Sequence, residues 1–89
     1  MTAPAAPPPL VPWPDFLTRR EKEIARLVCE GRRRSEVVEL LGIAPKTFDS
    51  HRYEAMVKLG VTNEVQLVRL ALAVGWVAFT ADELARAPP

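Results

Sequence analysis

Residues 35–60 read SEVVELLGIAPKTFDSHRYEAMVKLG, and this stretch decides the fold. Its first apolar residues predict a short helix over about 36–41, which Gly42 ends by supplying a left-handed conformation. Pro45 occupies a position that a first helical turn tolerates, and the apolar spacing after it predicts a longer helix over about 45–59. Two such helices with a short connection are typical of a helix-turn-helix. A plain helical hairpin gives much of the same pattern, so spacing alone leaves DNA binding and a bare helical bundle equally open.

Two further helices are predicted on either side of this stretch. Thr18-x-x-Glu21 is a capping box, and the apolar spacing after it predicts a helix over about 19–30. A fourth helix is predicted over about 64–74, beginning after Thr62 or Asn63. We expect Ser35 to cap the helix over 36–41. No strand pattern competes, so the chain is predicted to be all-α, a four-helix bundle that contains a helix-turn-helix.

The flanks differ from this body in composition. Six of the nine prolines fall in residues 1–16, which predicts a proline-rich extended arm with Trp13 or Phe16 resting on the domain. A dedicated proline-motif ligand is the alternative. Residues 17–77 form the expected domain and 78–89 a C-terminal extension, in which a second capping box at Thr80 permits a short helix over 81–86.

Length and composition exclude several function classes. The 89 residues suffice for one domain, and a formal net charge of +1 excludes a chain held to nucleic acid by bulk charge alone. The apolar stretches are too short for a membrane span and no leader pattern is present, so we expect a cytoplasmic protein without membrane contact. One cysteine and one histidine provide neither a disulfide nor a zinc ligand set, and no catalytic constellation can be assembled. We expect a binding protein that is not an enzyme and has no metal or cofactor.

Two single residues have mainly structural interpretations. Cys29 lies away from the apolar side of its predicted helix, so we expect its thiol to be at least partly exposed and chemically inert. His51 is expected to be a partly buried packing residue rather than a ligand.

Positive charge is concentrated in one region. Residues 17–34 contain seven basic and three acidic residues, which gives a local charge of +4. Its last three residues, Arg32, Arg33 and Arg34, form a basic loop that can bind backbone phosphates. A solvated loop that keeps the chain soluble is the alternative.

The outward side of the helix over 45–59 is polar. With about 100° between successive residues and Phe48 pointing inward, the residues on the opposite side are Lys46, Ser50, Tyr53 and Val57. Asp49 and Glu54 fall at the margins. Lysine, serine and tyrosine can donate hydrogen bonds to bases or phosphates, and an aspartate can accept one from cytosine.

Several motifs together resemble a known family. Leu17-Thr-Arg-Arg-Glu21 opens the body, and Lys58-Leu59-Gly60-Val61 follows the third helix. With residues 35–41, 43–47 and 51–52, they are similar to the LuxR-type (GerE-like) helix-turn-helix domain over about residues 17–77. The resemblance implies a four-helix domain whose third helix enters the major groove and whose fourth often contributes to dimer contacts.

The resemblance also implies which residues face DNA. On the third helix they are Lys46, Thr47, Asp49, Ser50, Arg52 and Tyr53. Three positions depart from the family pattern. Asp49 replaces a basic or neutral polar residue, Phe48 replaces a small β-branched one, and Ala44 leaves the third helix without a side-chain cap, a loss of about 1 kcal/mol.

Two functions from different classes follow. The first is a sequence-specific regulator of transcription that binds duplex DNA, forming a homodimer through its fourth helix. The residues expected at the dimer or partner contact are Val65, Val68, Leu72 and Trp76. The second is a protein-interaction module on the same scaffold, which binds another regulator or RNA polymerase, with Asp49 and Glu54 discouraging DNA.

Overall fold

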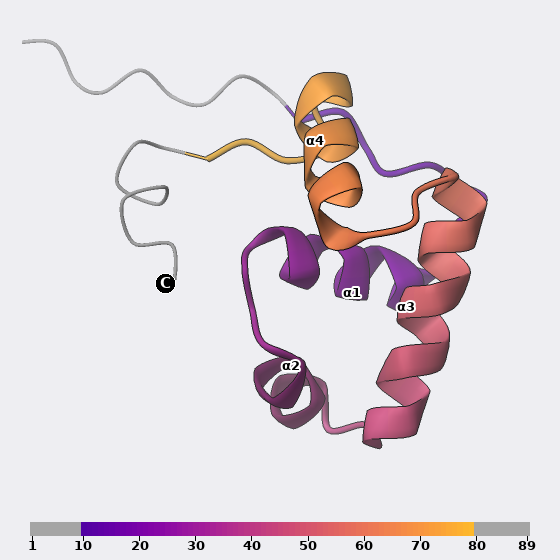
Figure 1. Cartoon of the computed structure of the whole chain (residues 1–89), viewed down its shortest axis with the longest axis vertical. Coiled ribbons are helices and arrows are strands. Elements are labelled where there is room, and N and C mark those ends of the chain that lie inside the picture. Colours follow the sequence, from indigo (N-terminus) through magenta and orange to yellow (C-terminus); the bar gives the residue numbers. More distant parts are fainter. Residues whose placement is uncertain (1–9, 80–89) are drawn as a thin grey trace, which may run out of the picture.

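The computed structural model describes residues 10–79, and this part of the chain is helical without any strand. The four helices are α1 (Arg19–Cys29), α2 (Arg34–Leu41), α3 (Pro45–Leu59) and α4 (Glu64–Val74). Helix α1 contacts both α3 and α4, and α2 contacts α3. In Figure 1, α2 lies at the end of the molecule where α3 begins, and α4 lies at the opposite end. The predicted all-α fold with a helix-turn-helix is confirmed.

Side-chain caps fix where α1 and α4 begin, whereas α3 begins at a proline. The Glu21 backbone N–H donates to Thr18 Oγ1 over 3.1 Å, and the Thr18 N–H donates to Glu21 Oε1 over 2.9 Å, which is the predicted capping box. Asn63 caps α4 by accepting from the Gln66 N–H over 2.9 Å. Helix α3 begins at Pro45 with no side-chain cap from Ala44, as expected.

Helix α2 begins two residues earlier than predicted, and Ser35 is not its cap. The residue before the helix is Arg33, whose backbone N–H donates to the Glu36 carboxylate over 3.1 Å. The Arg33 carbonyl accepts the first helical hydrogen bond from the Val37 N–H over 3.0 Å. The carboxylate of Glu36, three residues after Arg33, therefore selects the helix start, and Ser35 lies within the first turn, exposed to solvent.

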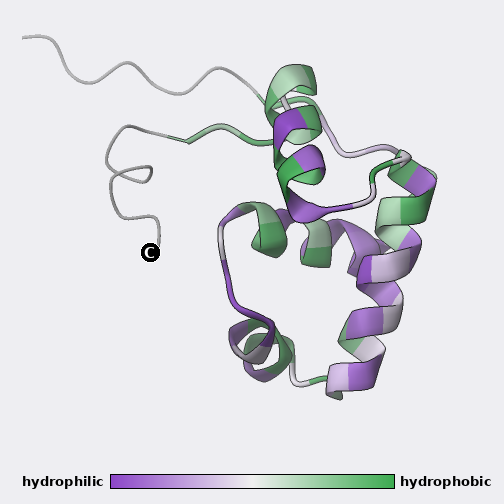
Figure 2. Ribbon diagram, in the orientation of Figure 1, coloured by the Kyte–Doolittle hydropathy of each residue, from purple (hydrophilic) through white to green (hydrophobic). Residues whose placement is uncertain are grey.

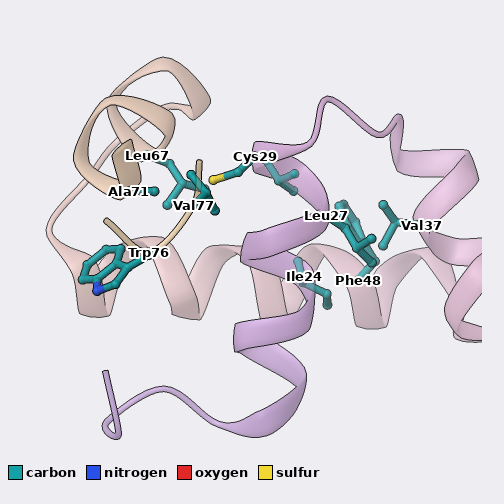
Figure 3. Close-up of a cluster of buried hydrophobic side chains, with 10 residues drawn as sticks. Ile24, Leu27, Cys29, Val37, Phe48, Leu67, Ala71, Trp76 and Val77 are labelled. Atoms are coloured by element: carbon teal, nitrogen blue, oxygen red, sulfur yellow. The ribbon is translucent and has the colours of Figure 1, made fainter. Parts of the chain in front are cut away.

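The core draws on all four helices. Ile24, Val37 and Leu67 come from α1, α2 and α4 and are essentially inaccessible to solvent. Phe48 of α3 joins them at 3% exposure, so the larger side chain at this position is accommodated by packing. Figure 3 shows Phe48 between Leu27 and Val37. Apolar residues thus face the interior of the bundle, while polar residues cover much of the outside of α3 (Figure 2).

The expectation that Cys29 is at least partly exposed is wrong. Its residue exposure is 6%, and its sulfur atom points toward Leu67 and Val77 (Figure 3). The prediction counted only the apolar stripe of α1 that meets α3. The last turn of α1 is also covered by α4 and by the chain that follows α4, so the buried side of this helix is wider than the stripe.

The segments on either side of the four helices pack against each other. The Val11 N–H donates to the Gly75 carbonyl over 2.8 Å, and the rings of Trp13 and Trp76 stack with centroids 4.9 Å apart at 28°. Trp13 rests on the domain as expected, whereas Phe16 is 59% exposed. Residues 1–9 of the predicted arm and the predicted helix over 81–86 lie outside the described residues.

Trp76 was expected on a dimer or partner surface and is instead in the core, at 8% exposure. After Gly75, which has φ +96°, the backbone turns back, and the N–H groups of Trp76 and Val77 donate to the Ala71 carbonyl over 2.9 and 3.4 Å. This turn carries the indole under Trp13 and away from the outer side of α4.

Candidate nucleic-acid interface

One side of α3 is open to solvent along most of its length. Lys46, Ser50, Tyr53 and Val57, which we call the outer face of α3, are all exposed, and Tyr53 retains 65% of its accessible surface. On the opposite side, Phe48 and Ala55 are buried. The helical period therefore separates the two faces as the sequence predicted, and the outer face of α3 is accessible to a ligand.

Polar groups occupy the amino-terminal half of this face. Lys46 and Thr47 are exposed, and the Ser50 hydroxyl donates to the Lys46 carbonyl over 3.1 Å. The hydroxyl proton of Ser50 is thus engaged within the helix, and its lone pairs remain available as acceptors. Lys46 has no ion-pair partner among residues 10–79.

Asp49 is paired with the first residue of α2. Arg34 Nε donates to Asp49 Oδ1 and Arg34 Nη2 to Asp49 Oδ2, both over 2.8 Å. The hydrogen bonds from Arg34 hold the pKa of Asp49 below its usual range, with smaller contributions from the charges of Arg34 and Arg52. The carboxylate is therefore ionised near neutral pH, and each of its oxygens accepts one hydrogen bond from the same guanidinium.

Arg52 also has an acidic partner. Its Nη2 donates to Glu64 Oε1 over 3.0 Å, joining α3 to the first residue of α4. The Arg52 side chain is 32% exposed, and neighbouring His51 is half-buried, as expected for a packing residue. Arg52 thus lies beside the outer face of α3 rather than on it.

The basic loop is exposed but partly neutralised. Arg32 lies 3.7 Å from a Glu30 oxygen and 3.8 Å from a Glu36 oxygen, distances that indicate weak pairing. Arg33 has no ion pair within the described part of the chain. Arg34 belongs to α2 rather than to the loop.

An ion pair between a buried carboxylate and a partly exposed lysine positions α3 against α1. Lys58 Nζ donates to both carboxylate oxygens of Glu21, over 2.7 and 3.1 Å, and Glu21 is only 3% exposed. Glu21 also forms the capping box with Thr18. One side chain therefore fixes both the start of α1 and the position of the last turn of α3.

Helix α4 presents a small apolar surface. Val65 and Leu72, one heptad apart, are 66% and 45% exposed, and Val68 between them is half-buried against the core. The exposure of Val65 and Leu72 is compatible with the predicted dimer or partner contact, which stays a prediction, whereas Trp76 lies in the core.

Sequence reasoning missed the ion pairs Arg34–Asp49, Arg52–Glu64 and Glu21–Lys58. Their partners are 15, 12 and 37 residues apart, so no helical i, i+4 spacing signals them. The only available signal was the acidic residue Asp49 beside a surface otherwise suited to an anion.

These observations define the class of protein. A short α2, a tight turn and an exposed polar face on α3 make this chain a helix-turn-helix domain. The model of the family described as "Bacterial regulatory proteins, luxR family" matches residues 15–71, and the chain belongs to this family.

Curated relatives agree with the family. The chain is 42% identical over 62 residues to the transcriptional regulatory protein UhpA of Escherichia coli, covering 70% of this chain and 31% of UhpA. It is 42% identical over 64 residues to the transcriptional regulatory protein MctR of Rhizobium johnstonii, covering 72% of this chain and 30% of MctR. It is 36% identical over 59 residues to the response regulator UvrY of Escherichia coli, covering 66% and 27%. The chain therefore spans about a third or less of the length of these relatives. Among the described residues, no helix has the length and apolarity needed to cross a bilayer.

Proposed function

We propose that the chain is a sequence-specific regulator of transcription that binds duplex DNA through α3 in the major groove. One observation carries the proposal: the outer face of α3 is open to solvent while the opposite face is buried in the core. An α-helix fits the major groove, and base edges there are read by donor and acceptor side chains. Membership of a family of regulatory proteins supports the same function.

Each part of the surface has a proposed role. Lys46 and Thr47 lie in the first turn of α3, and Ser50 and Tyr53 follow on its exposed side, so these residues contact base edges or nearby phosphates. Arg32 and Arg33 bind backbone phosphates next to α2. Three further predicted contact residues act within ion pairs rather than as free charges, namely Arg34, Asp49 and Arg52.

We also propose that the regulator binds as a homodimer through α4. The exposed side chains of Val65 and Leu72, with Val68 beneath them, supply an apolar contact that a second copy can cover. Sedimentation of the V65D variant tests this proposal. We expect V65D to lower the dimer fraction and weaken binding to paired half-sites, with the monomer fold intact. An unchanged dimer fraction would contradict the proposed contact.

The experiment is selection of duplexes from a randomised pool by the full chain, followed by fluorescence polarisation with the enriched duplex. We expect K46A and Y53A each to weaken binding by about 1–3 kcal/mol. The control is R19A, which removes one positive charge from the almost fully exposed Arg19 at the start of α1. Full affinity in both K46A and Y53A would contradict the proposed role of α3.

Salt dependence provides a second measurement. The local charge of +4 by itself predicts an affinity that falls steeply with added salt. Because several of these arginines and Arg52 are paired with carboxylates, we expect a slope of log affinity against log salt that is shallower than the same number of free charges would give. Loss of one contact to a phosphate should lower this slope by about one.

A protein-interaction module that binds another regulator or RNA polymerase is the second candidate. It is favoured by the pairing of Arg34 and Arg52 with carboxylates and by the near-neutral charge of the chain. If this candidate is correct, the selection enriches no sequence and random duplex fails to bind even at low salt.

A further inference from the structure

The ion pair between Arg34 and Asp49 joins the two helices of the helix-turn-helix at their surface. Arg34 is the first residue of α2, and Asp49 is the fifth residue of α3. Their side chains are 55% and 52% exposed, so the pair lies in solvent beside the outer face of α3. Figure 1 shows α2 at the end where α3 begins. Lys46 and Ser50 belong to this first half of α3.

The atoms used in the pair leave part of the guanidinium free. A guanidinium carries five N–H donors, and the Arg34–Asp49 pair uses one from Nε and one from Nη2. Both donors of Nη1 and the second donor of Nη2 remain. One N–H of Nη1 and the remaining N–H of Nη2 lie parallel to each other on another edge of the same planar group. This edge can donate two parallel hydrogen bonds to one pair of acceptor atoms.

The same geometry restricts what Asp49 can do. Each of its oxygens accepts one hydrogen bond from Arg34, so only the remaining lone pairs, which point away from Arg34, can accept from a cytosine amino group. While the pair is closed, the carboxylate fixes the plane of the guanidinium and removes rotamer freedom from a long side chain. A side chain that is already oriented loses less freedom when it binds a ligand.

We propose that Asp49 is a positioning residue, which holds Arg34 so that the free edge of its guanidinium meets a pair of acceptor atoms on duplex DNA. The acceptor pair is either N7 and O6 of a guanine or two oxygens of a phosphate, since both match this edge. The inference rests on the proposed function. On this inference, Asp49 supports DNA binding rather than opposing it, and it adds sequence selectivity where the acceptor pair belongs to a guanine.

The test compares D49N, R34K and the double variant. Polarisation is measured with the duplex that the wild-type chain selects and with a mixed-sequence duplex of equal length. We expect D49N to weaken binding to the selected duplex roughly tenfold, because Arg34 is no longer held for a bidentate contact. Binding to the mixed duplex should be unaffected if Arg34 reads a guanine, and should weaken to the same degree if Arg34 binds a phosphate. R34K should behave similarly, since an ammonium lacks the planar, parallel N–H groups of a guanidinium and cannot be oriented by Asp49 in the same way. The double variant should lose no more than either single one.

Two results overturn the inference. If D49N binds both duplexes as well as or better than the wild type, Asp49 acts only as a repulsive charge. If the losses of D49N and R34K add in the double variant, Asp49 contacts DNA without Arg34. The variant D49E, which keeps the carboxylate, should recover part of the lost affinity, and circular dichroism checks that each variant folds.

Two further measurements distinguish a guanine from a phosphate as the acceptor and test the contact between Asp49 and Arg34 in the free chain. Replacing single guanines of the selected duplex with 7-deazaguanine weakens wild-type binding at one position if Arg34 reads N7, and at none if it binds a phosphate. The Arg34 Nε–H resonance of the free chain should exchange faster with water in D49N, and an unchanged rate also contradicts the inference. If wild-type chain binds no duplex, the proposed function fails with it; if K46A weakens binding and D49N does not, only the role of Asp49 fails.

Discussion

The buried Glu21 carboxylate links α1 to α3 through its ion pair with Lys58. Burial raises its pKa, but the Lys58 ammonium and the Thr18 groups that donate to it outweigh burial, so the net shift is downward. A carboxylate with a lower pKa in the folded chain than in the unfolded chain stabilises the fold above the unfolded pKa. This contribution is lost as the pH falls through the folded pKa.

The prediction for this residue is a pH-dependent effect of E21Q. Glutamine can still accept from the Thr18 N–H, so the variant removes mainly the charge that Lys58 contacts. We expect the free energy of unfolding to fall by about 1–2 kcal/mol at pH 7, moderated by the partial exposure of Lys58. Urea titrations at a series of pH values should show the difference in stability between E21Q and the wild type closing as the pH falls below the range in which a glutamate ordinarily ionises. A difference that stays constant with pH would contradict the role assigned to the ion pair.

Cys29 provides a second prediction at this scale. Burial, followed by the charges of Glu30 and Glu64, raises the pKa of its thiol to about 12. At pH 8 the thiolate fraction is then on the order of one in ten thousand, and the thiolate is the reactive form. We expect Ellman's reagent to modify the native chain far more slowly than the urea-unfolded chain. Equal rates in the two states would show that the thiol is accessible.

At the scale of helices and turns, Gly42 determines how α2 leads into α3. Its φ is +63°, and the N–H groups of Gly42 and Ile43 donate to the carbonyls of Glu39 and Val38. A Cβ added at Gly42 would meet no atom within 4 Å. The cost of a side chain here is therefore conformational rather than steric.

The prediction for the turn uses G42A. We expect a loss of about 1–2 kcal/mol in the free energy of unfolding, because an L-residue is forced into the left-handed region. The matched control is G42N, which should cost less, since asparagine adopts this conformation more readily. Thermal and urea unfolding provide the measurement. Equal stability of G42A and the wild type would contradict the turn geometry.

Local patterns predicted most of these elements. The bounds of α3 and α4 agree with those expected from apolar spacing, and their ends lie at glycines. The start of α2 was missed because a single contact from Glu36 to the Arg33 backbone competes with the Ser35 cap. Burial of Cys29 and Trp76 was missed because it depends on how the chain after α4 folds back, which no local period encodes. The exposed side of α3 was predicted, whereas the partners of its charges, being distant in sequence, were not.

At the scale of the whole molecule, the stack of Trp13 on Trp76 joins the segment before α1 to the segment after α4. The indoles stack 4.9 Å apart, and the Val11–Gly75 hydrogen bond lies beside them. We expect W13A to lower the free energy of unfolding by about 1–2 kcal/mol, because an apolar contact and a stacked aromatic pair are lost. F16A, which alters an exposed side chain of the same segment, should change it by less than about 0.5 kcal/mol. Equal effects of the two variants would show that the stack contributes little.

The Val11–Gly75 hydrogen bond and the Trp13–Trp76 stack hold the segment before α1 and the segment after α4 together at the α4 end of the molecule. The amino end of α3 lies at the opposite end (Figure 1). A fluorophore or surface linker attached to either segment would therefore sit remote from Lys46 and Arg34. Immobilising the domain through that end leaves the helix-turn-helix facing the bulk solution, where a duplex added in flow can approach it without obstruction.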